Sequence, residues 1–252
     1  MSEAGREVIV TGVSRGLGEA LARVLIERGF RVTGIGRSAG AGLAGPRFEL
    51  VRCDLSDAAA IDDALEAPFA AIAARAPAYV CLVNNAAVAG PIGVLGRTTS
   101  RDIAAAFGVN LAGPAALANL FCRVFGASRG ERRIINVSSG AATRPLPGIV
   151  LYSAAKCGLE MVTAGIAAEQ GKDGIRAVSL RPGIIATQMQ VDARSRTVDE
   201  FPSVAMFRDF HEKRQLVLPD VAAARIATHV VEAPVEQGKV YVYADLGAPS
   251  AT

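Results

Sequence analysis

Two side chains capable of acid–base chemistry lie four residues apart in an Ala-rich stretch with helical composition. Tyr152 and Lys156 stand at i and i+4, so a helix over residues 149–170 would place them on one face. A free tyrosine has a pKa of about 10, too high for easy proton exchange at neutral pH. A neighbouring ammonium favours the phenolate and is expected to lower the pKa of Tyr152. The pair is a candidate for proton transfer, although the same spacing is common on purely structural helices.

A pair of serines precedes this helix. Ser138 and Ser139 follow the apolar run 133–137 directly. A hydroxyl at the end of a strand can donate a hydrogen bond to a substrate oxygen and stabilise charge that develops there. Two serines at a strand end more often only cap the next turn, and the residues alone leave the choice between Ser138 and Ser139 open.

A glycine-rich stretch lies near the amino terminus. The apolar run 7–10 leads into TGVSRGLG at residues 11–18, and a helical pattern follows. Glycines let the backbone turn sharply and approach a pyrophosphate, and the helix start offers free N–H groups and a positive dipole end. The spacing is Gly-x3-Gly-x-Gly instead of GxGxxG. Its place between a strand and a helix predicts a dinucleotide site.

The segment after the second expected strand bears on the choice of nucleotide. An NAD site usually carries an acid there that accepts from the ribose 2′-hydroxyl. No Asp or Glu occurs between Arg28 and Phe48, and the strand ends at Arg37. Arg37 and Arg15 could hold a 2′-phosphate, which favours NADP(H), although both could also be solvated surface residues. Asp54 could bond the adenine amino group or simply begin a helix.

Short β-branched runs alternate with long Ala/Leu-rich helical stretches along the chain. Several of the runs are apolar on both faces, as in a parallel sheet covered by helices. This alternation predicts an α/β, single-domain, Rossmann-type doubly wound parallel sheet of about seven strands with helices on both faces. The expected strands are 7–10, 31–35, 48–52, 79–83, 133–137, 176–180 and 239–243, and the expected helices are 17–28, 58–75, 100–125, 149–170 and 219–232.

No linker or repeat divides the chain, so residues 1–252 are expected to form one dinucleotide-binding and catalytic domain. Residues 39–46 are rich in Gly and Ala and should be loose. Residues 187–216 are a second irregular segment and carry apolar side chains such as Met189, Phe201 and Phe207. Long loops in compact domains are often lids, and we expect a substrate lid here. A helix pair that merely packs on the core is the alternative.

Composition narrows the class of protein. The net charge is only +3 over 252 residues and the arginines are scattered, which argues for a solvated surface and against nucleic acid binding. Four cysteines without a CxxC pair are expected to be reduced thiols. The two histidines lack metal-ligand spacing, so no metal is expected. We find neither a signal peptide nor a run of about 18 apolar residues, and we expect a cytoplasmic protein without a membrane partner.

Taken together, the motifs resemble the short-chain dehydrogenase/reductase family over nearly the whole chain. Beside TGVSRGLG they comprise CDL at 53–55, NNAA at 84–87, NVSSG at 136–140, YSAAK at 152–156 and RPGIIAT at 181–187. Their joint order and spacing make the resemblance specific. It implies an oxidoreductase in which a nicotinamide cofactor gives a hydride to a carbonyl carbon, Tyr152 donates the proton and Ser139 steadies the oxygen.

The resemblance also implies roles for further residues. Lys156 binds the nicotinamide ribose hydroxyls, and Asn110 holds a water that connects Lys156 to solvent. The backbone at Ile185 and the hydroxyl of Thr187 meet the carboxamide. The implied catalytic set is Asn110, Ser139, Tyr152 and Lys156, and the implied cofactor-binding set is Gly12, Ser14, Arg15, Gly16, Leu17, Gly18, Arg37, Asp54, Leu55, Asn85, Ala86, Tyr152, Lys156, Pro182, Gly183, Ile185 and Thr187.

Two departures from the family pattern matter. The chain reads NNAA where the family usually has NNAG, so Ala87 adds a methyl group near the cofactor. It also lacks the Asp-Gly-Gly ending common in acyl-carrier reductases. The stretches TGVSRGLGEALA, LYSAAKCGLEM and RPGIIATQMQ are most similar to the sepiapterin reductase and benzil reductase branch.

That branch implies a small aromatic or vicinal dicarbonyl substrate. Two other functions stay open: 3-oxoacyl-[acyl-carrier-protein] reduction, and a non-catalytic NADP-sensing regulator, which would be expected to lose Tyr152 or Lys156. The resemblance implies a homodimer through the helices 100–125 and 149–170, with a tetramer as the alternative.

Overall fold

The computed structural model describes residues 5–247 and is built around one seven-stranded parallel sheet. The strand order is β3-β2-β1-β4-β5-β6-β7. Because β2 and β4 flank β1, the chain reverses its direction of travel across the sheet between β1 and β4, and parallel sheets bind ligands at such a switch point. The predicted doubly wound fold is confirmed. The strands are β1 (Arg6–Thr11), β2 (Arg31–Gly36), β3 (Phe48–Arg52), β4 (Tyr79–Asn84), β5 (Glu131–Val137), β6 (Arg176–Arg181) and β7 (Val240–Val242).

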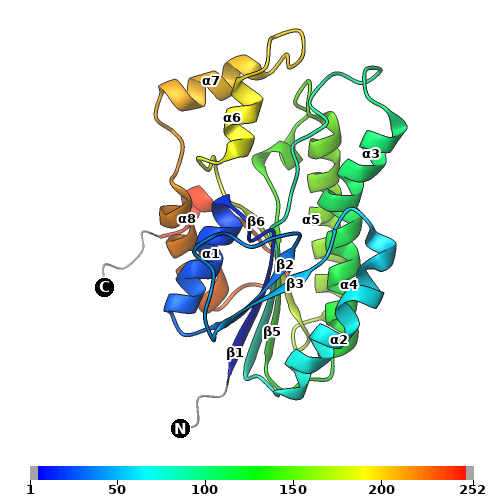
Figure 1. The fold of residues 1–252 in the computed structure, drawn as a ribbon, viewed down its shortest axis with the longest axis vertical. Helices are drawn as coiled ribbons and strands as arrows, with labels where there is room; N and C mark the ends of the chain where they lie inside the picture. Colours follow the sequence, from blue (N-terminus) through cyan, green and yellow to red (C-terminus); the bar gives the residue numbers. More distant parts are fainter. Residues whose placement is uncertain (1–4, 248–252) are drawn as a thin grey trace.

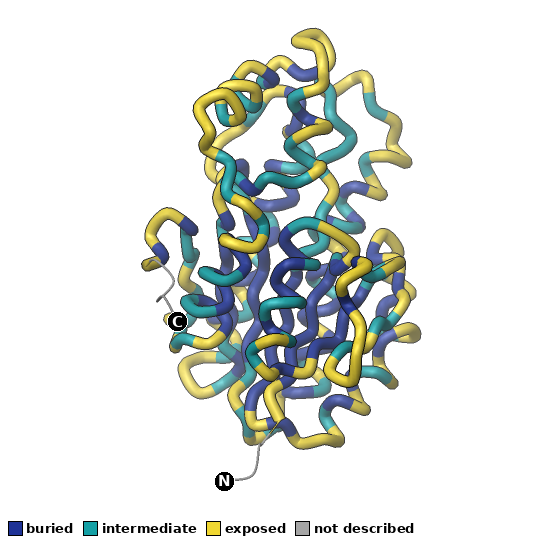
Figure 2. Tube along the Cα trace, turned by 60° about the vertical axis from the view of Figure 1, so that its left-hand side comes forward, coloured by how far each residue is buried: buried dark blue, intermediate teal, exposed yellow. Residues whose placement is uncertain are grey.

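Helices cover both faces of the sheet (Figure 1). On one face lie α1 (Gly16–Glu27) and α8 (Pro219–Ile226), whose apolar sides share a core with residues of β1, β4 and β6. On the other face lie α2 (Ile61–Ala74), α4 (Gly113–Phe125) and α5 (Val150–Gln170), which close a second core. Figure 2 shows the sheet as the most deeply buried part of the chain. The rigid sheet therefore fixes the positions of its carboxyl-terminal strand ends.

The expected helix 100–125 is interrupted. It forms α3 (Ser100–Phe107), a π-helical turn (Gly108–Ala112) and α4. Glycines at the turn let the helix approach the loop after β3, because a Cβ on Gly108 would lie 2.4 Å from the Ser56 carbonyl oxygen and one on Gly113 would lie 2.7 Å from that of Leu55. The expected helix 219–232 likewise divides into α8 and a π-helical turn (Ala227–Glu232).

From the sequence we expected no apolar stretch long enough to cross a membrane, and the structure does not confirm this expectation. The segment Ser100–Phe125 is long and apolar enough to cross a membrane by length and composition alone. Buried residues make up 44% of its apolar window, and α4 contributes Leu117, Leu120 and Phe121 to the core beneath the sheet. This amount of apolar surface is what a core helix needs, so the segment is only weak support for a membrane span.

One arginine departs from the expected solvated surface. Arg133 on β5 is 1% exposed and donates to three carbonyl oxygens, those of Val230 at 2.5 Å, Val231 at 2.9 Å and Ala233 at 2.9 Å. These carbonyls close the π-helical turn after α8, where the helix dipole favours a cation. Arg133 therefore anchors the carboxyl-terminal helix to the sheet.

Residues 187–216, expected to be irregular with a helix pair as the alternative, contain two helices: α6 (Gln188–Arg194) and α7 (Val204–Glu212). They lie beyond the carboxyl ends of the strands, at the top of Figure 1. The two ends of the segment are joined beside the sheet, because Ala186 N donates to Val217 O and Val217 N to Ile184 O, both at 2.8 Å. Phe201 is fully buried in a small separate core beneath these helices.

Candidate active site

A cleft of about 1660 Å³ opens at the carboxyl ends of the strands. It runs from the loop after β1, past the ends of β4, β5 and β6, to the helices α6 and α7. Drug-sized ligands occupy pockets of about 300–1,000 Å³, so this cleft can hold a dinucleotide together with a small second molecule. It lies where a doubly wound sheet binds nucleotides.

The glycine-rich loop forms one end of the cleft. Gly12 and Gly16 have φ angles of 74° and 63°, in the left-handed region that favours glycine. A Cβ on Gly18 would lie 2.3 Å from Gly12 O and 2.4 Å from Asn85 Nδ2, so only glycine allows this close packing. The loop leads into α1, whose free N–H groups face the cleft lined by Ser14, Gly16 and Leu17. This cradle fits a pyrophosphate.

The loop after β4 is tied to the cradle. The Thr11 hydroxyl accepts from the N–H groups of Asn85 and Ala86, both at 2.9 Å, and Asn85 Nδ2 donates to Thr11 O at 2.9 Å. The amide of Asn85, predicted to bind the cofactor, is therefore engaged in holding two loops together. Ala86 and Ala87 line the cleft, and the Cα of Ala86 would lie 2.9 Å from a Cβ on Gly12.

Two exposed arginines stand at the same end of the cleft. Arg15 caps the start of α1 without a side-chain hydrogen bond to it, and Arg37 follows β2. Within residues 5–247 neither guanidinium forms an ion pair within 4.0 Å. Arg52, which the sequence reasoning missed, donates to Arg37 O at 2.7 Å and fixes that backbone. The arrangement provides positive charge where an NAD site would provide a carboxylate.

Asp54 lies beside these arginines. Its Oδ1 accepts from Ser56 N at 3.0 Å and from Ser56 Oγ at 2.8 Å, and these bonds lower the pKa of the carboxyl group. Both the expected adenine contact and the alternative of a turn-forming residue are compatible with this position, because Asp54 and Leu55 line the cleft.

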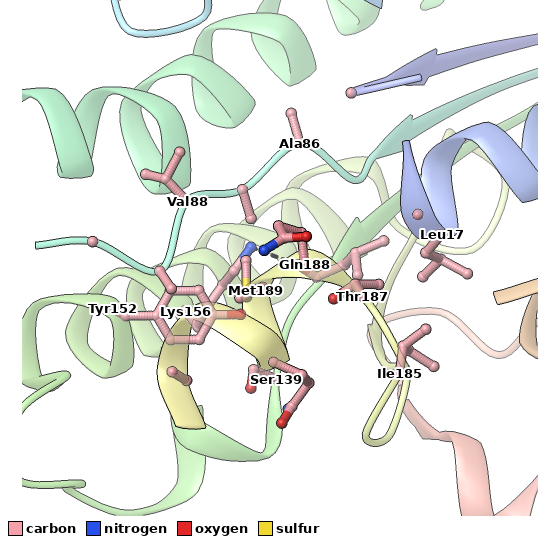
Figure 3. A pocket seen from close by; sticks show the side chains of 18 of the residues that line it. Leu17, Ala86, Val88, Ser139, Tyr152, Lys156, Ile185, Thr187, Gln188 and Met189 are labelled. Carbon is pink, nitrogen blue, oxygen red and sulfur yellow. Dashed lines mark hydrogen bonds between the residues drawn. The ribbon is translucent and has the colours of Figure 1, made fainter. Parts of the chain in front are cut away.

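At the other end of the cleft the proton-transfer candidates meet (Figure 3). Tyr152 and Lys156 project from α5, and the Lys156 Nζ lies 5.8 Å from the centre of the Tyr152 ring. Ser139 is in hydrogen-bonding reach of the Tyr152 hydroxyl. Ser138 points elsewhere, because its hydroxyl donates to Glu160 at 2.6 Å. The structure therefore brings Ser139, and not Ser138, to the phenol.

The electrostatics of this group are dominated by burial. Burial raises the pKa of Tyr152, and the hydrogen bond with Ser139 opposes the rise. Burial also lowers the pKa of Lys156 from 10.5 to about 8, while its Nζ donates to Val137 O at 2.8 Å. The expected lowering of the Tyr152 pKa is therefore wrong for the protein alone, because loss of hydration is the largest influence on the phenol and raises its pKa.

Asn110 lies in the π-helical turn that packs against α5. It is fully buried, and its amide pairs with the backbone of Val88, which donates to Oδ1 at 3.1 Å and accepts from Nδ2 at 2.9 Å. The side chain thus fixes the loop after β4 at the edge of the cleft. π-Helical turns of this kind are frequent at functional sites.

The turn after β6 closes the cleft. Pro182 is buried, Gly183 has a φ angle of 79°, and the backbone of Ile185 forms a bridge with Val217. Thr187 begins α6, and its methyl group would lie 3.1 Å from a Cβ on Gly16. The first residue of the segment 187–216 therefore touches the glycine cradle.

Apolar side chains from four segments line the far end of the cleft together with Tyr152. Met189, Met206 and Phe207 belong to the segment expected to form a lid, whereas the sequence reasoning missed Val88, Leu146 and Ile149. It also missed Glu160 on α5, which binds Ser138 and Arg181. An acidic residue one turn beyond Lys156 was the available signal, but such a residue is usually solvated.

Comparison with known proteins places this geometry in context. The family model described as short chain dehydrogenase matches residues 6–197. A benzil reductase ((S)-benzoin forming) of Bacillus subtilis is 28% identical over 235 residues, which are 92% of this chain and 96% of that protein. An L-xylulose reductase of Caenorhabditis elegans is 30% identical over 225 residues, 84% of this chain and 87% of that protein.

Solved structures give the same picture. A short chain dehydrogenase/reductase from Saccharomyces cerevisiae aligns with a TM-score of 0.82 at 25% identity, covering 96% of this chain and 97% of its own. A short chain dehydrogenase from Burkholderia cenocepacia, solved in complex with NADP, aligns with a TM-score of 0.73 at 28% identity, covering 94% and 96%.

Proposed function

Since the chain belongs to the short-chain dehydrogenase family, we propose that it is an NADPH-dependent reductase that converts a carbonyl group to an alcohol. The observation that carries the proposal is the meeting of Tyr152, Ser139 and Lys156 at one end of a cleft whose other end is a glycine cradle. Its substrate is a small aromatic or vicinal dicarbonyl compound.

In the proposed reaction the bound cofactor supplies a hydride to the carbonyl carbon. The Tyr152 hydroxyl donates its proton to the substrate oxygen, and the Ser139 hydroxyl donates a hydrogen bond to that oxygen as charge develops. Lys156, as an ammonium, holds the ribose hydroxyls and stabilises the phenolate left on Tyr152. Asn110 keeps the loop after β4 against the π-helical turn beside α5. In the proposed relay Lys156 passes a proton to the Tyr152 phenolate, and a water held at Asn110 then returns a proton from solvent to Lys156.

The proposed preference for NADPH rests on charge. Arg15 and Arg37 are both exposed at the cradle end and have no ion pair within the described residues, and a 2′-phosphate would supply one. Gly12, Ser14, Gly16, Leu17 and Gly18 would hold the pyrophosphate, and Pro182, Gly183, Ile185 and Thr187 the nicotinamide end.

The proposed substrate class rests on the apolar far end of the cleft. Met189, Met206 and Phe207 suit an aromatic ligand, and the benzil reductase relative acts on such a diketone by its name. The alternative of an acyl-carrier reductase receives no support from charge. The carrier is acidic, yet residues 187–216 hold five acidic and five basic side chains apart from His211. The sensor alternative is disfavoured because Ser139, Tyr152 and Lys156 are all present.

We further propose that residues 1–252 act as one domain, with residues 187–216 as a substrate lid, in a cytoplasmic homodimer. The exposed side of α5 supports the dimer, since Met161 is 72% exposed on it. Light scattering of the pure protein tests this assembly, and a monomeric mass would contradict it.

The test of the function is oxidation of NADPH by the pure protein over a panel of benzil, phenylpropanedione, a pterin dicarbonyl and an acetoacetyl thioester. We expect rapid turnover of a diketone and a loss of about 10²–10⁴-fold in Tyr152→Phe, with NADPH affinity retained. Tyr241→Phe is the matched control, because Tyr241 lies on β7 and its hydroxyl accepts from Glu236 N outside the cleft. Activity that survives in Tyr152→Phe would contradict the proposed mechanism.

A further inference from the structure

A carboxylate outside the proposed proton-transfer group connects the strand ends that carry that group. Glu160 Oε1 accepts from Ser138 Oγ at 2.6 Å and from Arg181 Nε at 2.8 Å. Its Oε2 accepts from Arg181 Nη2 at 2.7 Å. The Glu160 side chain is 16% exposed and that of Arg181 is 23% exposed, so the bidentate pair is largely withdrawn from water.

The two partners of Glu160 leave the sheet side by side. Val137 on β5 is in register with Leu180 on β6, and Ser138 N donates to Leu180 O at 2.7 Å. Ser138 directly follows β5, and Arg181 is the last residue of β6. Beyond them come Ser139 on one chain segment and the Pro182–Gly183 turn on the other. Glu160 therefore holds both segments at the point where they enter the cleft.

Glu160 is also the central member of a ladder between α5 and the end of β5. Thr163 accepts from Asn136 Nδ2 at 2.9 Å, Glu160 accepts from Ser138, and Lys156 donates to Val137 O at 2.8 Å. The last two residues of β5 and the residue that follows it are thus bonded by three residues on one face of α5. These three contacts fix the position of α5 along the end of β5, and so the position of Tyr152 relative to Ser139.

The charge state of the carboxylate fits this role. Burial alone would raise the pKa of Glu160, but the hydrogen bonds from Arg181 and Ser138 outweigh it and leave the pKa below its ordinary value. Glu160 is therefore ionised throughout the neutral range. An ionised carboxylate with three donors is fixed in one orientation, as a positioning group requires.

We propose that Glu160 is a positioning residue of the active site: it locks Ser139 and the nicotinamide-side turn to the helix that carries Tyr152 and Lys156. The proposal rests on the proposed reductase function for its effect on turnover, although the geometry does not depend on it. Glu160 is not among the residues that line the cleft, so its loss should disturb the alignment of the reacting groups more than cofactor binding.

The test compares Glu160→Gln with Glu7→Gln. Glu7 is a matched control because it is buried and accepts from Arg75 at 2.7 and 3.1 Å, but lies at the opposite end of the sheet. We expect Glu160→Gln to lower kcat by about 10- to 100-fold with the KM for NADPH within about threefold, since small misplacements cost about 10²-fold. Glu7→Gln should lower the melting temperature and leave kcat within about twofold.

Two partner variants separate positioning from general destabilisation. Ser138→Ala removes one hydrogen bond to Glu160, and Arg181→Lys reduces the bidentate pair to a single donor. Each variant should therefore lower kcat by less than Glu160→Gln does. The double variant Ser138→Ala/Glu160→Gln should be no slower than Glu160→Gln alone, because both changes break one unit. Wild-type kcat in Glu160→Gln, or a fall in NADPH affinity that matches the fall in kcat, would overturn the proposal.

Hydrogen–deuterium exchange distinguishes this failure from failure of the proposed function. Peptides covering residues 138–143 and 181–187 should exchange faster in Glu160→Gln than in wild type. The same peptides should exchange at the wild-type rate in Glu7→Gln. This outcome would support the positioning role even if no carbonyl compound were reduced. Equal exchange in the two variants would overturn it whatever the enzyme's activity.

Discussion

NADPH binding should weaken steeply as the pH rises above about 8, because Lys156 loses its charge there. The Nζ of Lys156 is enclosed, with a relative exposure of 1% for the residue, and burial lowers its pKa from 10.5 to about 8. We expect only the ammonium form to hold the ribose hydroxyls. Tyr152 and Cys53, which also line the cleft, both have raised pKa values and do not titrate in the same range.

The size of the effect follows from the charged fraction. A lysine with a pKa of about 8 is roughly nine-tenths charged at about pH 7 and roughly one-tenth charged at about pH 9. The apparent dissociation constant scales with the inverse of the competent fraction, so it should rise about tenfold between these two values. Binding at about pH 9 should also take up about one proton per molecule, because only the ammonium form of Lys156 binds the ribose hydroxyls.

Calorimetric titration in buffers of different ionisation heat measures both quantities. Lys156→Met should bind NADPH weakly at every pH and take up no proton. Lys172→Met, which changes the exposed lysine just beyond the end of α5, should behave like wild type. A dissociation constant that stays flat up to about pH 9.5 in the wild type would refute either the lowered pKa or the role of Lys156 as a cofactor ligand.

Three further outcomes are expected. Gly18→Ala should lower the free energy of unfolding by about 1–3 kcal/mol and weaken NADPH binding, because its Cβ would lie 2.3 Å from a backbone oxygen. Gly42 faces open space, so Gly42→Ala should change neither quantity. Thermal denaturation measures the first effect and titration with NADPH the second. Arg37→Ala should reduce the preference for NADPH over NADH by about 1.5–3 kcal/mol, measured as a ratio of kcat/KM values, and an unchanged ratio would remove Arg37 from the site. Phe201→Ala should destabilise residues 187–216 by up to about 3–5 kcal/mol, because the ring is fully buried, and slower hydrogen exchange than wild type there would contradict the packing.

The strands were predictable from sequence because their apolar runs are short, β-branched and bounded by turns. Each of the seven expected strands overlaps an observed one, with ends that differ by at most two residues. The interruption at Gly108–Ala112 could not be predicted, since the apolar pattern continues through it. It arises from the approach of Gly108 and Gly113 to the loop after β3, which is a tertiary contact.

The site was predicted unevenly for a similar reason. The glycine cradle and the Tyr152–Lys156 spacing are local patterns, so the sequence alone indicated them. The sequence left the helices α6 and α7 only as an alternative, because they have seven and nine residues and no side-chain cap, so their stability comes from packing around Phe201. Glu160 was missed because a single acid on a long helix looks solvated until β5 and β6 bring its partners to it.

The opposing pKa shifts of Tyr152 and Lys156 set the pH range in which the proposed reduction can proceed. A tyrosine whose pKa is raised by burial stays protonated across the neutral range, which suits the donation of a proton to a carbonyl oxygen. Oxidation of an alcohol needs the phenolate as a base, and that form becomes accessible only when a nearby cation is present. Because the pKa of Lys156 is about 8, that cation is being lost at the alkaline pH where the phenolate would form. The two shifts thus keep Tyr152 protonated and Lys156 charged at and below neutral pH, so the reductive kcat should fall as the pH rises above about 8.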